Sequence, residues 1–170
     1  MKNLIKTTLL SAALLLSISV VNAQQKIAHI NSAELIKSMP EIVVADKQLE
    51  VYKGTLDTDG KTMYAEYQKK VADFQSKEKT MSEALKEAKV KEIQDLEKRI
   101  QEFQQKASQD FEAKRGELYD PILKKAEQAV KTVAKEKGLA YVIDVSQQAV
   151  IYYDGGVNIL ADVKAKLGIK

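Results

Sequence analysis

A heptad pattern of apolar residues is the strongest constraint on how this chain can fold. Apolar side chains recur in steps of three and four over residues 42–56, and similar seams follow over 64–81 and 93–111. Such a seam lets one helix pack lengthwise against another as a coiled coil. The pattern therefore predicts long paired helices, with a change of phase between the first two seams near Asp57–Gly60. The seam residues are Ile42, Ala45, Leu49, Tyr52 and Leu56, then Tyr64, Tyr67, Val71, Phe74 and Met81, then Ile93, Leu96, Ile100, Phe103, Ala107 and Phe111.

The helices are expected to fold back on each other near residues 78–84. Thr80-Met81-Ser82-Glu83 fits a capping box, in which the Thr80 hydroxyl accepts the Glu83 amide at a helix start. Pro40 lies 40 residues before Thr80 and Pro121 lies 41 after it. Two legs of near-equal length would bring both prolines to the base of an arm, with a further helix beginning after Pro121. Each leg would extend roughly 58 Å, so the sequence predicts a coiled-coil hairpin arm over residues 41–120.

The segments on either side of the arm are expected to form a small body over residues 24–40 and 121–170. Residues 26–30 and 140–145 have the pattern of short strands, and residues 149–153 are interpreted as a third strand that forms a hairpin with the second. Because a lone hairpin is barely stable in water, the strands from the two ends of the chain must meet. We therefore expect an α+β, mostly helical fold. The small core also favours oligomerisation of the body.

Residues 1–23 have the pattern of a secretory signal peptide. Lys2 and Lys6 supply positive charge, residues 9–21 are almost continuously apolar, and Val21-Asn22-Ala23 places small residues where a signal peptidase reads. The apolar run of about 13 residues is shorter than the roughly 20 that span a bilayer. We expect cleavage after Ala23 and export to the periplasm, leaving a mature chain of about 147 residues.

The residue types that build common catalytic and metal sites are scarce. Cysteine is absent and His29 is the one histidine, so a zinc site lacks its usual ligands. The sequence contains no glycine-rich phosphate loop and no nucleophile elbow. The full chain has 27 basic and 24 acidic residues. Removal of Lys2 and Lys6 with the signal peptide leaves 25 basic residues and a net charge of +1, which does not favour a nucleic-acid partner. We therefore expect no enzymatic activity, no catalytic residue, no cofactor and no metal.

Several seam side chains are larger or more adaptable than a simple two-helix zipper needs. Aromatic and methionine side chains can repack around different partners, so some are expected to contact an unfolded client as well as close the seam. Gly54 and Gly60 each cost roughly 1 kcal/mol inside a helix relative to alanine. They are candidate hinges of the arm, with a tolerated local defect as the alternative. The client-contact candidates are Met63, Tyr64, Tyr67, Phe74, Met81, Phe103 and Phe111.

The mature chain resembles the Skp/OmpH family of periplasmic chaperones along its whole length. The resemblance implies a homotrimer in which three arms enclose a cavity. It also implies an ATP-independent holdase function, in which the cavity binds unfolded outer-membrane β-barrel proteins. It is carried by the coiled-coil middle together with Lys26-Ile27-Ala28-His29-Ile30-Asn31, Arg115-Gly116-Glu117-Leu118, Tyr141-Val142-Ile143-Asp144, Val150-Ile151-Tyr152 and Asn158-Ile159-Leu160-Ala161-Asp162-Val163.

The near-neutral charge departs from the basic character of this family. The stretch Ala107-Ser108-Gln109-Asp110 carries no basic cluster, which makes lipopolysaccharide binding doubtful and shifts weight towards apolar client contacts. The main alternative function is that of an exported coiled-coil structural adaptor that docks to a cell-envelope complex. Such adaptors usually carry β-rich domains beside the hairpin. Only about 55 residues remain here for all strands and terminal helices, which argues against that alternative.

Overall fold

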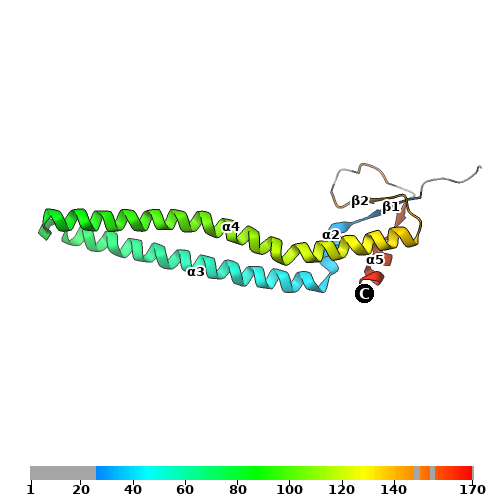
Figure 1. Cartoon of the computed structure of the whole chain (residues 1–170), viewed down its shortest axis with the longest axis horizontal. Helices are drawn as coiled ribbons and strands as arrows, with labels where there is room; N and C mark the ends of the chain where they lie inside the picture. Colours follow the sequence, from blue (N-terminus) through cyan, green and yellow to red (C-terminus); the bar gives the residue numbers. More distant parts are fainter. Residues whose placement is uncertain (1–25, 148–149, 154–155, 170) are drawn as a thin grey trace, which may run out of the picture.

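A long two-helix arm projects from a small body (Figure 1). The computed structural model describes residues 26–147, 150–153 and 156–169, so the expected signal peptide and its cleavage site lie outside the described residues. This mostly helical α+β architecture confirms the predicted fold class. The elements, in chain order, are β1 (Ile27–Ile30), α2 (Ser32–Ser38), α3 (Pro40–Lys77), the 3-10 turn η2 (Glu78–Thr80), α4 (Glu83–Glu136), β2 (Tyr141–Asp144), β3 (Val157–Asn158) and α5 (Leu160–Lys166).

The tip of the arm lies between α3 and α4, and its cap differs from the predicted one. Ser82 is the N-cap of α4, and its hydroxyl accepts the amide of Leu85 at 3.4 Å. The Thr80 hydroxyl instead donates to the carbonyl of Lys77 at 2.8 Å. The capping box on Thr80 is therefore wrong by two residues, because η2 continues the outgoing leg through Thr80 before the backbone extends at Met81 and Ser82.

Helix α4 does not end at Pro121, contrary to the sequence prediction. It runs unbroken from the tip of the arm into the body, with Pro121 in its interior. Proline has no amide hydrogen, so the carbonyl of Glu117 lacks its usual helical donor, and Figure 1 shows α4 changing direction between arm and body. Ile122, Ala126 and Ala129 follow the proline and are buried in the core. Their burial favours continuation of the helix, which offsets the cost of the proline.

The sheet has three strands in the order β2-β1-β3, and both pairings are parallel. Ile27 lies opposite Tyr141 in one ladder, and His29 lies opposite Asn158 in the other. The predicted hairpin between residues 140–145 and 149–153 is therefore wrong. Residues 150–153 form no strand, Ala149 lies outside the described residues, and β3 comes later in the chain. Because β1 takes the central place and offers both of its edges, β2 and β3 add to opposite sides instead of pairing with each other.

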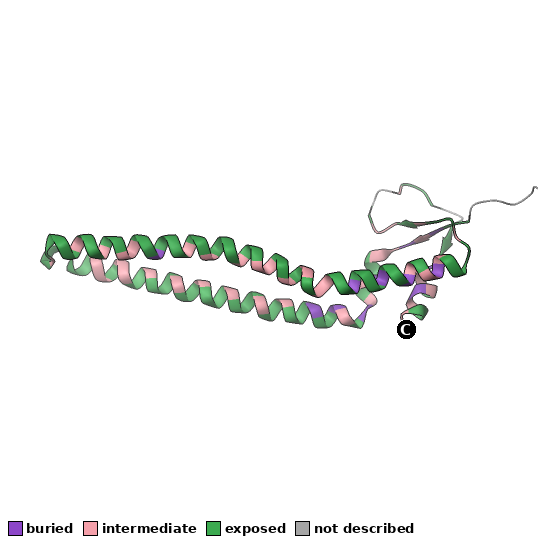
Figure 2. Ribbon diagram, viewed as in Figure 1, coloured by how far each residue is buried: buried purple, intermediate pink, exposed green. Residues whose placement is uncertain are grey.

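The hydrophobic core lies almost entirely in the body (Figure 2). Alternate residues of β1, Ala28 and Ile30, point towards the helices, as the two-residue period of a strand requires. Further along the described part of the arm, beyond its base, Leu96 is the single buried side chain. The core of the body and of the adjoining base of the arm consists of Ala28, Ile30, Leu35, Met39, Ile42, Ala45, Ile122, Ala126, Ala129, Val133, Ile159 and Val163.

A polar contact joins the two ends of the chain at the edge of the body. The carboxylate of Asp144, at the end of β2, accepts hydrogen bonds from the amide of Ser32 at 3.1 Å and from the amide of Ser146 at 2.9 Å. The Ser32 hydroxyl donates to the second oxygen of the same carboxylate. Partial burial raises the pKa of Asp144, but these hydrogen bonds outweigh it and hold the pKa below its ordinary value. The start of α2 is thereby fixed to β2.

Candidate client-binding surface

The two legs of the arm close along a continuous apolar seam. Of the predicted seam residues, only Tyr64 is exposed, while the others are half-buried or buried. The seam passes the expected change of phase without interrupting α3, because Gly60 and Met63 occupy it there. A Cβ atom at Gly60 would lie 3.3 Å from Cε1 of Phe103, so the glycine provides the space into which this ring packs.

The second candidate hinge, Gly54, has different surroundings. It is exposed, and a Cβ atom there would meet no atom within 4 Å. Thr58 donates its hydroxyl to the Gly54 carbonyl at 2.7 Å, a local contact that competes with helical bonding and often bends helices. Helix α3 is nevertheless continuous through both glycines, so a role as hinges stays a prediction.

The predicted client-contact residues lie mainly within the seam. Tyr64 is exposed, and its ring stacks on that of Tyr67 with the centroids 6.1 Å apart. The rest contribute only part of their surface to solvent, and their role in client binding stays a prediction. These half-buried candidates are Met63, Tyr67, Phe74, Met81, Phe103 and Phe111.

Polar contacts tie the legs together at both ends of the seam. At the base, the Tyr119 hydroxyl donates to Asp46, and Lys125 forms an ion pair with Glu41. The Asp46 carboxylate raises the pKa of Tyr119 through that hydrogen bond. Near the tip, Lys70 on α3 pairs with Glu92 on α4. Cross-leg polar contacts thus accompany the apolar seam at its base and towards its tip.

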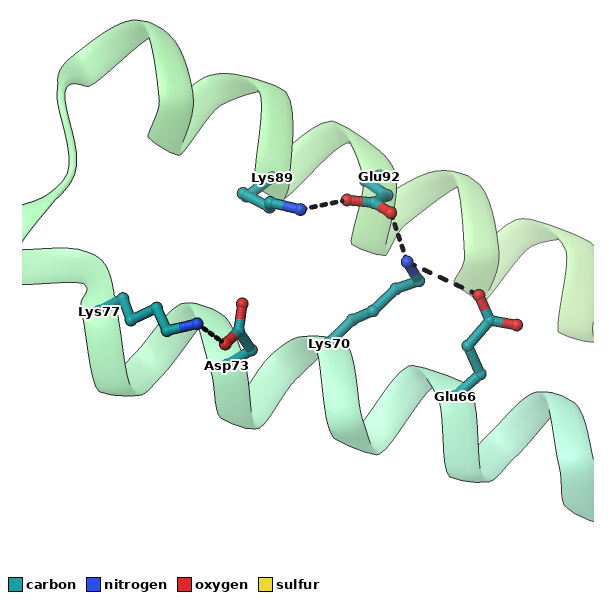
Figure 3. Close-up of polar contacts among 6 residues, drawn as sticks. All are labelled: Glu66, Lys70, Asp73, Lys77, Lys89 and Glu92. Carbon is teal, nitrogen blue, oxygen red and sulfur yellow. Dashed lines mark hydrogen bonds and ion pairs between the residues drawn. The ribbon is translucent and has the colours of Figure 1, made fainter.

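The contacts near the tip form a charged cluster, drawn in Figure 3. Glu92 lies between two cations, Lys70 from the opposite leg and Lys89 from its own helix, the latter at 2.9 Å. Lys70 also lies 3.6 Å from Glu66. Hydrogen bonds from Lys70 and Lys89 lower the pKa of Glu92 to about 2, and the bond to Glu92 raises the pKa of Lys70. This cluster fastens the legs, and its opposite charges are largely satisfied within it.

An exposed apolar surface that the seam does not use lies at the base of α3. Val43, Val44 and Val51 are 67%, 57% and 64% exposed, and they line a hollow of about 570 Å³ on the flank of the arm. We call this surface the valine hollow. Sequence reasoning missed it because it followed the heptad positions. The sequence did contain an indication of it, because Val43, Val44 and Val51 are large apolar residues of α3 that lie outside the heptad seam. The hollow is lined by Val43, Val44, Lys47, Gln48, Val51, Tyr52, Thr55 and Lys114.

A second exposed apolar surface is the outer face of the sheet. Ile27, Tyr141 and Ile143 point away from the helices and are exposed, with Tyr141 at 57%. Beside them the ring of Tyr153 lies on His29 with the centroids 4.8 Å apart. Parallel sheets are almost always covered on both faces. The described residues therefore leave uncovered a face that such sheets normally bury.

Comparison with known protein families shows where the chain belongs. The model of the family described as Outer membrane protein (OmpH-like) matches residues 26–167, which include every helix and strand of the described structure. The chain belongs to this OmpH-like family. Among its relatives, the Chaperone protein Skp of Yersinia enterocolitica is 34% identical over 167 residues, covering 96% of this chain and 97% of that protein. The Chaperone protein Skp of Photorhabdus laumondii is 31% identical over 170 residues, with the same coverage.

The OmpH-like fold is also found among solved structures. A crystal structure of an OmpH-like protein from Caulobacter crescentus superimposes with a TM-score of 0.71, covering 86% of this chain and 85% of the other. At 14% sequence identity this likeness concerns the fold alone. Within the described ranges, no helix is long and apolar enough to cross a membrane, and no three His, Cys, Asp or Glu side chains are grouped so that they could hold a metal ion.

Proposed function

We propose that the protein is an ATP-independent periplasmic holdase that binds unfolded outer-membrane β-barrel proteins between the arms of a homotrimer. The observation that carries this proposal is the nearly full-length similarity of this OmpH-like chain to proteins named Chaperone protein Skp. The pattern of a signal peptide in residues 1–23 supports export to the periplasm. Unfolded β-barrel proteins expose unpaired strands that aggregate, and shielding these strands requires no covalent chemistry.

The shape of the chain supports binding between several arms. A single arm is a pair of helices whose large apolar side chains mostly close its own seam, so one copy offers only limited apolar surface to a client. Several arms around a shared space would combine many weak contacts, which hold a client and still let it leave. The seam candidates, from Met63 to Phe111, and the hinges Gly54 and Gly60 belong to this proposal.

The uncovered face of the sheet supports self-association independently of the family. Ile27, Tyr141 and Ile143 expose apolar surface on a parallel sheet, and β2 lies at a sheet edge with one side open. Ile151 is 99% exposed in the nearby connection between β2 and β3. Exposed edges and apolar sheet faces are surfaces that proteins normally cover. A second and a third copy of this body would cover them in a closed ring.

The test is aggregation of a urea-unfolded outer-membrane β-barrel protein on dilution, with and without the mature chain from residue 24 onward and without nucleotide. We expect suppression at about three protomers per client, with the mass of a trimer measured by light scattering. A folded, assembled protein that leaves aggregation unchanged would contradict the holdase function. The search would then turn to a dedicated envelope partner of the arm.

A further inference from the structure

We propose that the valine hollow at the base of α3 binds an extended client segment whose apolar residues flank a carboxylate. This inference rests on the proposed holdase function and names the surface that makes the contact. Val43, Val44 and Val51 are the most exposed large apolar side chains of the arm, and the seam between the legs does not use them. They surround a concave surface large enough for several side chains of a partner.

The charges around the hollow specify the partner further. Lys47 and Lys114 line it, and no carboxylate is among its lining residues. Lys114 forms an ion pair with Glu117 at 2.9 Å, so Lys47 is the lysine of the hollow that is left to pair with a partner's carboxylate. An apolar floor beside Lys47 favours a segment that carries both apolar side chains and an acidic group, because a carboxylate gains a charge-assisted hydrogen bond from a lysine.

The spacing along α3 suits an extended strand. Val43, Lys47, Val51 and Thr55 follow one another at intervals of four residues, which places them about 6 Å apart along the helix axis. Side chains on one face of an extended strand are separated by two residues, about 6.6 Å. A segment lying along the helix can therefore place apolar residues over Val43 and Val51 and an acidic residue between them, near Lys47.

The size of the hollow favours such a segment over a second copy of the chain. Three valines and the edge of Tyr52 expose on the order of a few hundred Å², whereas a stable interface buries roughly 800 Å² on each partner. A small apolar surface with lysines at its rim is suited to weak and reversible contacts. Reversible contacts are what a holdase needs, since its client has to be released.

The first experiment compares matched pairs of substitutions in the full mature protein. Val43→Asp/Val51→Asp places charge in the hollow, and Leu85→Asp/Val90→Asp places the same charge at exposed positions of α4 near the tip. We expect the first pair to raise the protein concentration needed for half-suppression of client aggregation about tenfold. The second pair is expected to change it little. Circular dichroism and light scattering on both pairs establish that fold and oligomer mass are retained.

A direct binding measurement separates this inference from the proposed function. The probe is a fluorescent ten-residue peptide with valine at alternate positions and one central aspartate on the valine face, measured by anisotropy beside a version with lysine in place of the aspartate. We expect the aspartate peptide to bind more tightly and the preference to disappear in Lys47→Gln/Lys114→Gln.

The outcomes are distinguishable. Peptide binding that depends on Val43 and Val51, without suppression of aggregation, would contradict the holdase function and leave the hollow as a peptide site. Suppression that survives Val43→Asp/Val51→Asp unchanged would overturn the role of the hollow. Loss of the oligomer in that pair would show that the hollow is an interface between copies, which also overturns the proposal.

Discussion

At the scale of single residues, the two glycines of α3 have different surroundings, and only one of them is explained by packing. Gly60 faces Phe103 across the seam, while Gly54 faces open space. A glycine inside a helix is costly because its backbone loses more freedom on folding. At Gly60 that cost is offset by the packing of an aromatic ring, and at Gly54 no side chain makes use of the missing Cβ atom.

We therefore expect different responses to alanine at these two positions. Gly54→Ala should raise the free energy of unfolding by about 1 kcal/mol. Gly60→Ala should gain less or lose stability, because its Cβ atom would lie 3.3 Å from the Phe103 ring. Urea unfolding followed by circular dichroism measures both. Equal stabilisation by the two substitutions would show that Phe103 does not require the space at Gly60.

The Glu92 carboxylate provides a prediction on pH. Hydrogen bonds from Lys70 and Lys89 lower its pKa from 4.5 to about 2. A depressed pKa in the folded state means that the carboxylate contributes its full stabilisation above pH 4.5 and loses it as the pH falls through about 2. We expect the carboxyl resonance of Glu92 to titrate near that lower value in an NMR experiment, with the protection of the amides at the tip, relative to their intrinsic exchange rates, falling over the same interval.

The same cluster can be tested by substitution of Glu92, with Glu87→Gln at an exposed position of the same helix as the matched control. Glu92→Gln should accelerate amide exchange near the tip at neutral pH, because the tie to Lys70 loses its charge. Glu87→Gln should leave exchange unchanged. High salt should weaken the effect of Glu92→Gln, since exposed ion pairs are screened. If Glu92 titrated near its ordinary pKa of 4.5, the hydrogen bonds from Lys70 and Lys89 would not form as described.

At the scale of elements, the start of α4 shows how local signals compete. Both Thr80 and Ser82 are residue types that cap helices, and the Glu three residues after Thr80 made the earlier site the better match. In the structure η2 uses Thr80 to finish the outgoing leg, and Ser82 caps the returning one. The choice depends on where the chain can reverse direction while the two seams remain in register.

This difference is testable at the two capping positions. Ser82→Ala should lower the free energy of unfolding by about 1 kcal/mol, because the amide of Leu85 loses its acceptor. Thr80→Ala should have a smaller effect, since the Thr80 hydroxyl only donates to a carbonyl in an exposed turn. Chemical unfolding compares the two variants. A larger loss at Thr80 would restore the capping box that the sequence predicted.

At the scale of the whole molecule, the arm and the body depend on each other through α4. The helix begins at the tip, forms one leg of the arm, passes through Pro121 and then contributes Ile122, Ala126, Ala129 and Val133 to the core of the body. The orientation of the arm is thereby coupled to the packing of the body. Any assembly of bodies through their sheets would also set how the arms are arranged around the space between them.

The uncovered sheet face leads to a prediction about assembly. Tyr141→Asp/Ile143→Asp places two charges on the outer face of β2, where burial of unpaired charge is costly. We expect this variant to sediment with the mass of one protomer while its helices persist by circular dichroism. Val90→Asp on the arm is the matched control and should keep the mass of the parent protein. An unchanged mass in the sheet variant would exclude this face from the interface.

Much of the arm could be predicted from the sequence, because helix periodicity and seam spacing are local properties. The steps of three and four from Ile42 to Phe111 placed the seam residues together, and all of them except Tyr64 are buried or half-buried. The candidate site was less predictable. The heptad analysis directed attention to half-buried rings, whereas the valine hollow depends on which flank of α3 receives no cover from α4.

What the sequence by itself determined is that this chain forms two long antiparallel helices on a small mixed body, because each apolar stripe must find a partner of the same period. Only the tertiary structure decided that β1 separates β2 from β3, that α4 continues through Pro121, and that Gly60 receives Phe103. Each of these depends on contacts between residues far apart in the chain, where the free energy of burial outweighs the local preference of a turn, a proline or a glycine.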